Sequence, residues 1–294
     1  NFPFSNLFDK RDQMILSRFR ILTQGASAIL VNSYVAALYT RAVNANPLKG
    51  VCVPVLNCYA CPTALFACPI GTLQHFAAIH AFPYYPLAFM VIIGLVIGRM
   101  ACGWACPFGL LQDLMYKIKS PKYKAPPWLT HLKFPVLFIF VFALPYLTGD
   151  LWFSKLCPAG TLTAGIPWVL WNPVNPSTGM PVLPNGPGVI FYLCLVILAG
   201  FLVWFVLTRR PFCKGICPMG AILSIFNRFS IFQLHVKEGC DGCQICNDNC
   251  PMDLDVSLDT NSGDCIRCLE CTRCGHVKLV TPFSHEESVR WEKQ

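Results

Sequence analysis

The residues of this 294-residue chain best suited to chemistry are its 18 cysteines. They stand in short runs with two or three residues between them, unlike the framework expected of a small disulfide-stapled secreted domain. Thiolates at such spacings are soft ligands for iron–sulfur clusters or zinc. The sequence therefore predicts metal centres, and the remaining residues must supply the elements that position them.

Two cysteine runs lie near the C-terminus. Residues 240–251 read CDGCQICNDNCP, the C-x2-C-x2-C-x3-C-P run of bacterial ferredoxins, and residues 265–274 read CIRCLECTRC. A short loop closes only three corners of a cubane, so each run lends one ligand to the other. We expect two [4Fe–4S] clusters, one on Cys240, Cys243, Cys246 and Cys274, the other on Cys265, Cys268, Cys271 and Cys250. The second run ends C-x2-C-G, which leaves Cys274 the least typical ligand, and the alternative is a pair of structural zinc sites.

A second motif, CP-x-G, begins at four cysteines: Cys68, Cys106, Cys157 and Cys217. Two copies extend backward into C-x3-CP, with Cys102 before Cys106 and Cys213 before Cys217. Each extended copy follows an apolar stretch and one or two arginines, and each precedes an amphipathic segment. This pattern indicates a duplicated two-helix unit.

The composition excludes a wholly soluble enzyme. The chain is 54% hydrophobic and 13% charged, against about 25% charged residues in an ordinary soluble domain. Apolar stretches cover residues 21–40, 81–98, 134–149 and 188–208, close to the roughly 17–25 residues that a membrane helix needs. The alternative for the shorter or more polar stretches is a buried helix.

Lys and Arg are distributed unequally around these stretches. They concentrate before the first, between the second and third, and after the fourth, whereas the opposite loops hold only Arg41, Lys49 and Lys155. Because cytoplasmic loops carry the excess of Lys and Arg, we expect a multi-pass protein of the cytoplasmic membrane. Both termini and the ferredoxin segment would be cytoplasmic. Topology explains the net charge of +8, so nucleic-acid binding has no support.

Eight further cysteines fit two more cubanes in the membrane region. Topology places four at the inner face, Cys102, Cys106, Cys213 and Cys217, and four on the outer side, Cys58, Cys61, Cys68 and Cys157. We expect one inner and one outer cluster, each shared by both repeats. The rival takes one C-x3-CP plus one outer cysteine per repeat, and it needs deep re-entrant loops because a 17-residue helix rises about 25 Å. Disulfides are the alternative for the outer four.

The predicted fold is mainly α: a four-helix transmembrane bundle built from a two-helix repeat, with a C-terminal two-cluster ferredoxin domain. The expected division is a cytoplasmic segment 1–20, a membrane domain 21–235, a ferredoxin domain 236–280 and a polar tail 281–294. No histidine lies inside a predicted span and no CxxCH occurs, which argues against haem. No nucleotide fingerprint is visible.

The segments GRMACGWACPFGLLQD and RPFCKGICPMGAI, with the double ferredoxin run, resemble membrane polyferredoxins of the NapH, NosR and CcoG type. The likeness covers roughly residues 50–280, although CYACPTALFACP (residues 58–69) matches no single member. It implies an electron-transfer subunit of a membrane oxidoreductase complex. Such a subunit would connect cytoplasmic clusters with a quinone pool or with an extracytoplasmic cytochrome or reductase.

Three alternatives stay open: a quinol dehydrogenase with its own quinone site, a factor that reduces copper or assembles metal centres, and a structural anchor with zinc or disulfides. Gln74, His75 and His80 could contact a quinol near the outer interface, and Gln112 with Asp113 could contact a quinone head at the inner face. The simpler interpretation places these side chains on polar interfacial surfaces.

Overall fold

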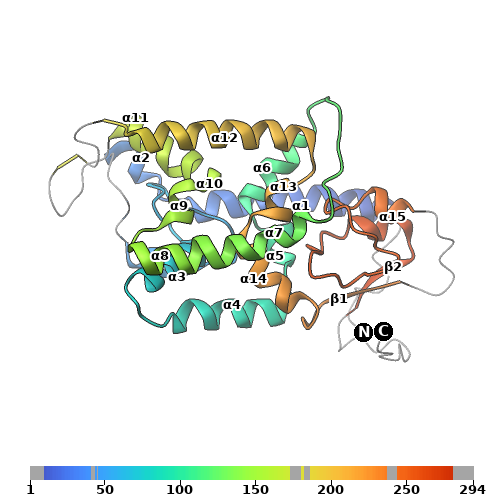
Figure 1. Cartoon of the computed structure of the whole chain (residues 1–294). Helices are drawn as coiled ribbons and strands as arrows, with labels where there is room; N and C mark the ends of the chain where they lie inside the picture. The colour runs from blue at the N-terminus through green and yellow to red at the C-terminus, as the bar shows by residue number, and fades with distance from the viewer. Residues whose placement is uncertain are drawn as a thin grey trace.

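The structure, a computed structural model, describes residues 10–40, 44, 46–172, 180–181, 186–236 and 244–280. It is mainly helical, and long helices run roughly along one axis of the molecule (Figure 1). They are α1 (Lys10–Val31), α4 (Tyr84–Ile97), the continuous helix α7–η2–α8 and α12 (Val189–Leu207). The continuous helix comprises α7 (Leu129–Val136), the π-helical η2 (Leu137–Ala143) and α8 (Leu144–Thr148).

Two helices in the described part of the chain are long and apolar enough to cross a membrane. Leu129–Thr148 and Val189–Leu207 have mean hydropathies of 1.6 and 2.8, and only 22% and 17% of their most apolar stretches are buried inside the molecule. A helix that is apolar on all sides and left exposed needs an apolar surrounding. These helices indicate association with a membrane, whereas α4, at 14 residues, is shorter than the predicted second span.

The first predicted span, residues 21–40, is not one helix, which corrects the expectation. Helix α1 (Lys10–Val31) starts upstream and stops at Val31, and α2 (Ala36–Thr40) follows a break. At the break the Tyr34 N–H bonds to the Thr63 carbonyl at 3.2 Å, and the Leu65 N–H bonds to that of Val31 at 2.8 Å. The chain unwinds here because its backbone pairs with the loop that carries Cys58 and Cys61.

Short helices surround the cysteine motifs. The C-x3-CP segments form α5 (Met100–Trp104) with α6 (Pro107–Tyr116), and α13 (Pro211–Gly215) with α14 (Pro218–Asn227). The other two CP segments start α3 (Pro69–Ala78) and α10 (Pro158–Gly160). The elements η1 (Pro47–Gly50), α9 (Trp152–Leu156), η3 (Thr161–Gly165) and α11 (Ile166–Trp171) complete this region.

The two repeats pack crosswise. Helix α4 of the first repeat lies against α14 of the second, and α12 of the second lies against α6 of the first. The C-terminal segment forms α15 (Ile245–Asp248), η4 (Glu270–Cys274) and an antiparallel pair of strands, β1 (Gln233–Val236) and β2 (Val277–Val280), with Leu234 opposite Leu279. In Figure 1 this segment occupies one end of the molecule, and α8 and α11 mark the other.

Candidate metal centres

Each CP-x-G motif places its cysteine at the start of a helix. Cys68, Cys106, Cys157 and Cys217 are the residues before α3, α6, α10 and α14, and the proline that follows is the first helical residue. Proline suits that position because its missing N–H would have no helical partner there. The Gly220 N–H lies 3.4 Å from Cys217 Sγ. The positive end of a helix favours a thiolate, which is the form of cysteine that binds metal.

The arginine before each C-x3-CP reaches into the other repeat. Arg99 donates from Nη2 to the Cys213 carbonyl at 3.1 Å, and Arg210 donates from Nη1 to the Cys102 carbonyl at 3.1 Å. Both guanidinium groups are completely buried. Arg210 also makes two bonds to the Asp113 carboxylate, while Arg99 bonds to Asp264 at 2.7 Å. The two cysteine loops are thereby held together by reciprocal contacts.

The glycine of CP-x-G leaves room for the arginine that reaches in from the other repeat. A Cβ on Gly220 would stand 2.9 Å from Arg99 Nη2, and one on Gly109 would stand 3.3 Å from Arg210 Nη1. The first separation is shorter than real Cβ contacts allow, and the second is tight. The glycines therefore let an arginine pass directly over the first turn of each helix.

The crossing brings the four inner cysteines together. Cys217 lies close enough to Cys102, Cys106 and Cys213 for their thiolates to repel one another, and Cys213 interacts in the same way with Cys106. All four are buried. Two loops, one from each repeat, thus converge on one place in the protein interior.

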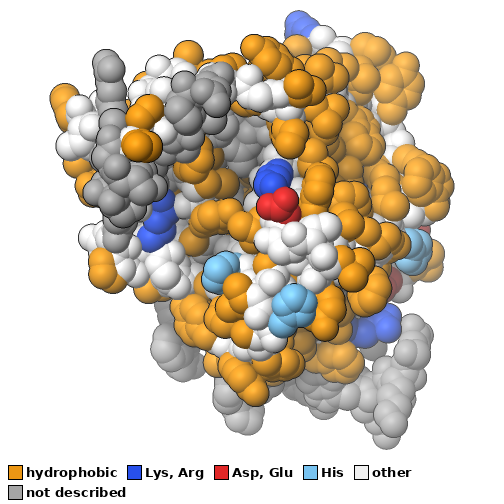
Figure 2. Space-filling model, turned by 60° about the vertical axis from the view of Figure 1, so that its left-hand side comes forward, with side chains coloured by type: hydrophobic (Ala, Val, Ile, Leu, Met, Phe, Trp, Pro, Cys, Tyr) orange, Lys and Arg blue, Asp and Glu red, His pale blue; other side chains and the backbone are white. Residues whose placement is uncertain are grey.

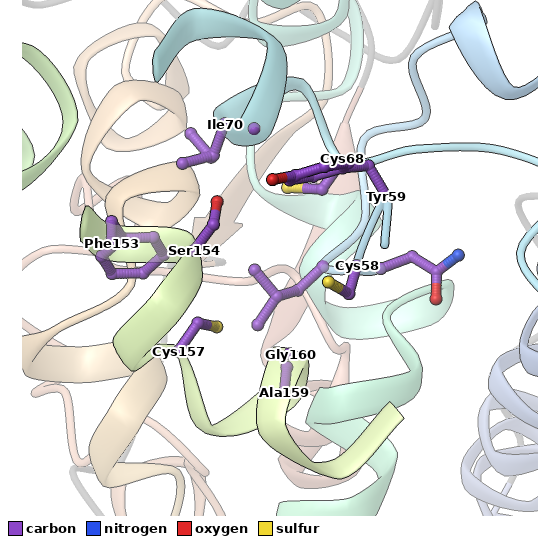
Figure 3. Close-up of a pocket in the computed structure, with 12 residues that line it drawn as sticks. Cys58, Tyr59, Cys68, Ile70, Phe153, Ser154, Cys157, Ala159 and Gly160 are labelled. Atoms are coloured by element: carbon purple, nitrogen blue, oxygen red, sulfur yellow. The ribbon is translucent and has the colours of Figure 1, made fainter. Parts of the chain in front are cut away.

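Three of the four outer cysteines line one cavity. Figure 3 shows Cys58, Cys68 and Cys157 around it, from three different segments of the chain. Tyr59, Phe153 and Ser154 are among the other residues that line it.

Cys61 does not line this cavity. Its Sγ lies 3.2 Å from Thr63 Oγ1 and 3.7 Å from Asn32 Oδ1, although Cys58 is near enough to interact with it electrostatically. Cys61 thus lies next to Cys58 but outside the lining of the cavity that the other three cysteines of the predicted outer set share.

A second cavity lies in the C-terminal segment. Its lining includes Cys250, Cys265, Cys268 and Cys271, one complete predicted set. Of the other set, Cys246 is buried on α15. Cys240 and Cys243 lie outside the described residues, as does the side chain of Cys274.

Successive cysteine groups are in contact through the backbone. A Cβ on Gly103, between Cys102 and Cys106, would stand 2.5 Å from the Ile266 carbonyl, which lies between Cys265 and Cys268. On the other side, Cys106 contacts the backbone of Leu56, a residue that lines the outer cavity. The inner group thus lies between the C-terminal and outer groups.

The thiols suit clusters better than single ions. No three His, Cys, Asp or Glu in the described ranges surround one ion position. A cluster instead occupies a space between its ligands, and cysteines line both cavities described above. Burial raises the pKa of the inner thiols, and it raises that of Cys58 to about 12 and that of Cys157 to about 11. Such thiols ionise when a cationic metal centre displaces their protons.

Sequence reasoning missed the buried ion pairs that join the C-terminal segment to the helices. Lys133 pairs with Asp264, Lys214 pairs with Asp253, and Arg20 lies 3.4 Å from Glu270. These partners are far apart in the chain, and only the run of basic residues beside the cysteine motifs hinted at them.

Three of the five side chains predicted to contact a quinone, those of Gln74, Gln112 and Asp113, bond to other protein groups. Gln112 is completely buried, and Asp113 accepts bonds from Arg210. Gln74 is completely buried and donates to Ser154 Oγ at 2.9 Å. His75 and His80 are exposed, and the His80 ring packs on Tyr146. In Figure 2, histidines and one acid–base pair interrupt a largely apolar face at this end.

The fold and the sites define a mainly helical, cysteine-rich protein in which cysteines line two cavities. A 4Fe–4S binding domain family matches residues 66–83, 79–126, 130–171 and 190–237, just over half of the chain. An uncharacterized protein of Methanocaldococcus jannaschii is 33% identical over 63% of this chain and 72% of its own length. The ferredoxin-type protein NapH of Haemophilus influenzae is 26% identical over 74% of this chain and 76% of its own.

The regulatory protein NosR of Stutzerimonas stutzeri is 30% identical over 64% of this chain, which spans only 25% of NosR. No solved structure matches. The chain belongs to the 4Fe–4S binding family, as a polyferredoxin of the NapH and NosR type.

Proposed function

We propose that the chain is the integral membrane electron-transfer subunit of an oxidoreductase complex. The observation that carries this proposal is the order of its cysteine groups: the C-terminal cavity, the inner four and the outer cavity, each touching the next. When bound, [4Fe–4S] clusters would supply one-electron chemistry at these places. The residues are the sixteen cysteines named above, divided into two ferredoxin sets, the inner set and the outer set.

The protein's own groups support this role by position and charge. Four buried cations lie among the cysteines: Arg99, Arg210, Lys133 and Lys214. They pair with only three carboxylates, those of Asp113, Asp253 and Asp264. Buried cations lower the cost of holding anionic thiolate centres in a medium of low polarity.

The two ends would exchange electrons with different partners. The C-terminal segment and the Lys-rich loop 117–124 would face the cytoplasm. The outer cavity would face an extracytoplasmic cytochrome or reductase, or the quinone pool. The description of the relative NapH as a ferredoxin-type protein supports electron transfer, while the relative NosR is described as a regulatory protein.

The test is a count of iron and acid-labile sulfide after anaerobic purification. We expect iron and sulfide for four [4Fe–4S] clusters per chain. The Cys213→Ser variant should contain the iron and sulfide of one cluster less. Cys194→Ser is the matched control, because Cys194 is buried on α12 and its Sγ bonds to the Lys155 carbonyl. A count of two clusters per chain, with the same count in Cys213→Ser, would contradict the two clusters proposed for the membrane region. Oxidation of a quinol by the isolated chain would favour the quinone pool over a protein partner.

A further inference from the structure

Gln112 touches a sulfur of the inner group. Its Nε2 lies 3.1 Å from Cys213 Sγ, with both residues buried, and also 3.3 Å from the Phe108 carbonyl. The amide thus has two hydrogens and two acceptors, one of them a cysteine of the other repeat. Among the described residues its Oε1 has no hydrogen-bond partner.

The second repeat has no amide at the matching position. Gln112 is the sixth residue after Cys106, and the sixth residue after Cys217 is Leu223, which is completely buried in the matching helix. A buried, unpaired amide oxygen costs free energy that a leucine avoids. The chain therefore holds an unfavourable group at one of two equivalent positions, and that group touches sulfur.

We propose that Gln112 is a positioning residue that raises the reduction potential of the inner cluster through its N–H···S bond to Cys213. This rests on the proposed function, in which the inner four cysteines bind a [4Fe–4S] cluster. Reduction adds negative charge that is shared with the ligand sulfurs, so a donor aimed at one sulfur stabilises the reduced form more than the oxidised form. The low polarity of the buried site strengthens the effect.

The experiment is an EPR-monitored redox titration of the anaerobically purified chain in detergent. The inner signal is identified as the one that Cys213→Ser removes. The Gln112→Leu variant places the residue of the second repeat at this position. At a fixed ambient potential, the ratio of reduced to oxidised inner cluster should fall about tenfold. This corresponds to a midpoint potential that is lower by about 59 mV for a one-electron step. Gln112→Met keeps the side-chain length, lacks the donor and should shift the same way.

Gln24→Leu is the control. Gln24 is also completely buried with an unpaired Oε1, but its Nε2 bonds to the Gly103 carbonyl at 2.8 Å instead of to sulfur. Its midpoint should stay in place. Intact clusters with an unchanged midpoint in both Gln112 variants, or an equal shift in Gln24→Leu, would overturn the role of Gln112 and leave the proposed function standing. Absence of an inner cluster in the unmodified chain would overturn both.

Discussion

Asp113 shows how much of the site depends on partners distant in sequence. From the sequence alone, Asp113 is a possible quinone contact or a polar interfacial residue, and Arg210 is one of the basic residues that follow the fourth apolar stretch. In the structure the two form a pair across 97 positions of chain, and Arg20 approaches the same carboxylate at 3.5 Å. Spacing motifs report local neighbours only, so the cysteines could be predicted from the sequence but the charges that surround them could not.

Removing this carboxylate should be costly. In Asp113→Asn, the buried Arg210 loses its counter-charge, and we expect a loss of about 3–5 kcal/mol of stability. Asp150→Asn, which breaks a pair with the exposed Lys155, should cost at most about 1 kcal/mol. Thermal unfolding of both variants in detergent measures the difference. Equal losses would show that the Asp113 pair is no stronger than a surface pair.

Protonation of the same carboxylate should lower the stability of the protein at acid pH. Burial alone would raise the pKa of Asp113, but Arg210 and Arg20 outweigh it and lower that pKa below its ordinary 3.8. The stabilising contribution is therefore complete above the ordinary value and is lost as pH falls through the lower folded value. Between pH 5 and 8 the cost of Asp113→Asn should stay constant.

At the scale of elements, predictions held where one pattern decides the structure. Helix α12 (Val189–Leu207) falls within the predicted stretch 188–208 because uniform apolarity leaves no other outcome. The stretch 21–40 broke because Asn32 and the backbone around it found partners in the loop that carries Cys61. An apolar stretch with polar residues inside it does not specify its own end.

Contact between α5 and the C-terminal segment depends on Gly103. In Gly103→Ala the new methyl would stand 2.5 Å from the Ile266 carbonyl, so the two backbones must separate. Overpacking of this kind costs about 1–3 kcal/mol. We expect faster hydrogen exchange and proteolysis within residues 244–280. Gly200→Ala on α12, with nothing within 4 Å, is the control. Equal protection in both variants would contradict the contact.

At the scale of the whole molecule, the elements beside the cysteine groups follow one another along the axis that the long helices define: α15, then α13 and α5, then α10 and α3 (Figure 1). The number of spans is less simple than the sequence indicated, since two helices have full membrane length and α4 is shorter. Hydropathy reports apolarity but not where a helix starts and ends, because the caps and breaks are set by contacts with other segments.

The proposed orientation can be tested with lysines at opposite ends of the molecule. Lys119 and Lys155 are both exposed. In sealed right-side-out vesicles, a membrane-impermeant amine reagent should label Lys155 but not Lys119, and inverted vesicles should show the reverse. Mass spectrometry of tryptic peptides reads both sites in one sample. Labelling of both lysines from one side would contradict a transmembrane arrangement.

The exchange of arginines between the repeats has a consequence for ancestry. A polypeptide of half this length, with one arginine and one C-x3-CP loop, could not satisfy its own guanidinium, since the acceptor carbonyl belongs to the other half. It would become complete only by pairing with a twin through a two-fold axis. The present chain is therefore what gene fusion would make of such a homodimer, with later divergence free to place Gln112 on one side and Leu223 on the other.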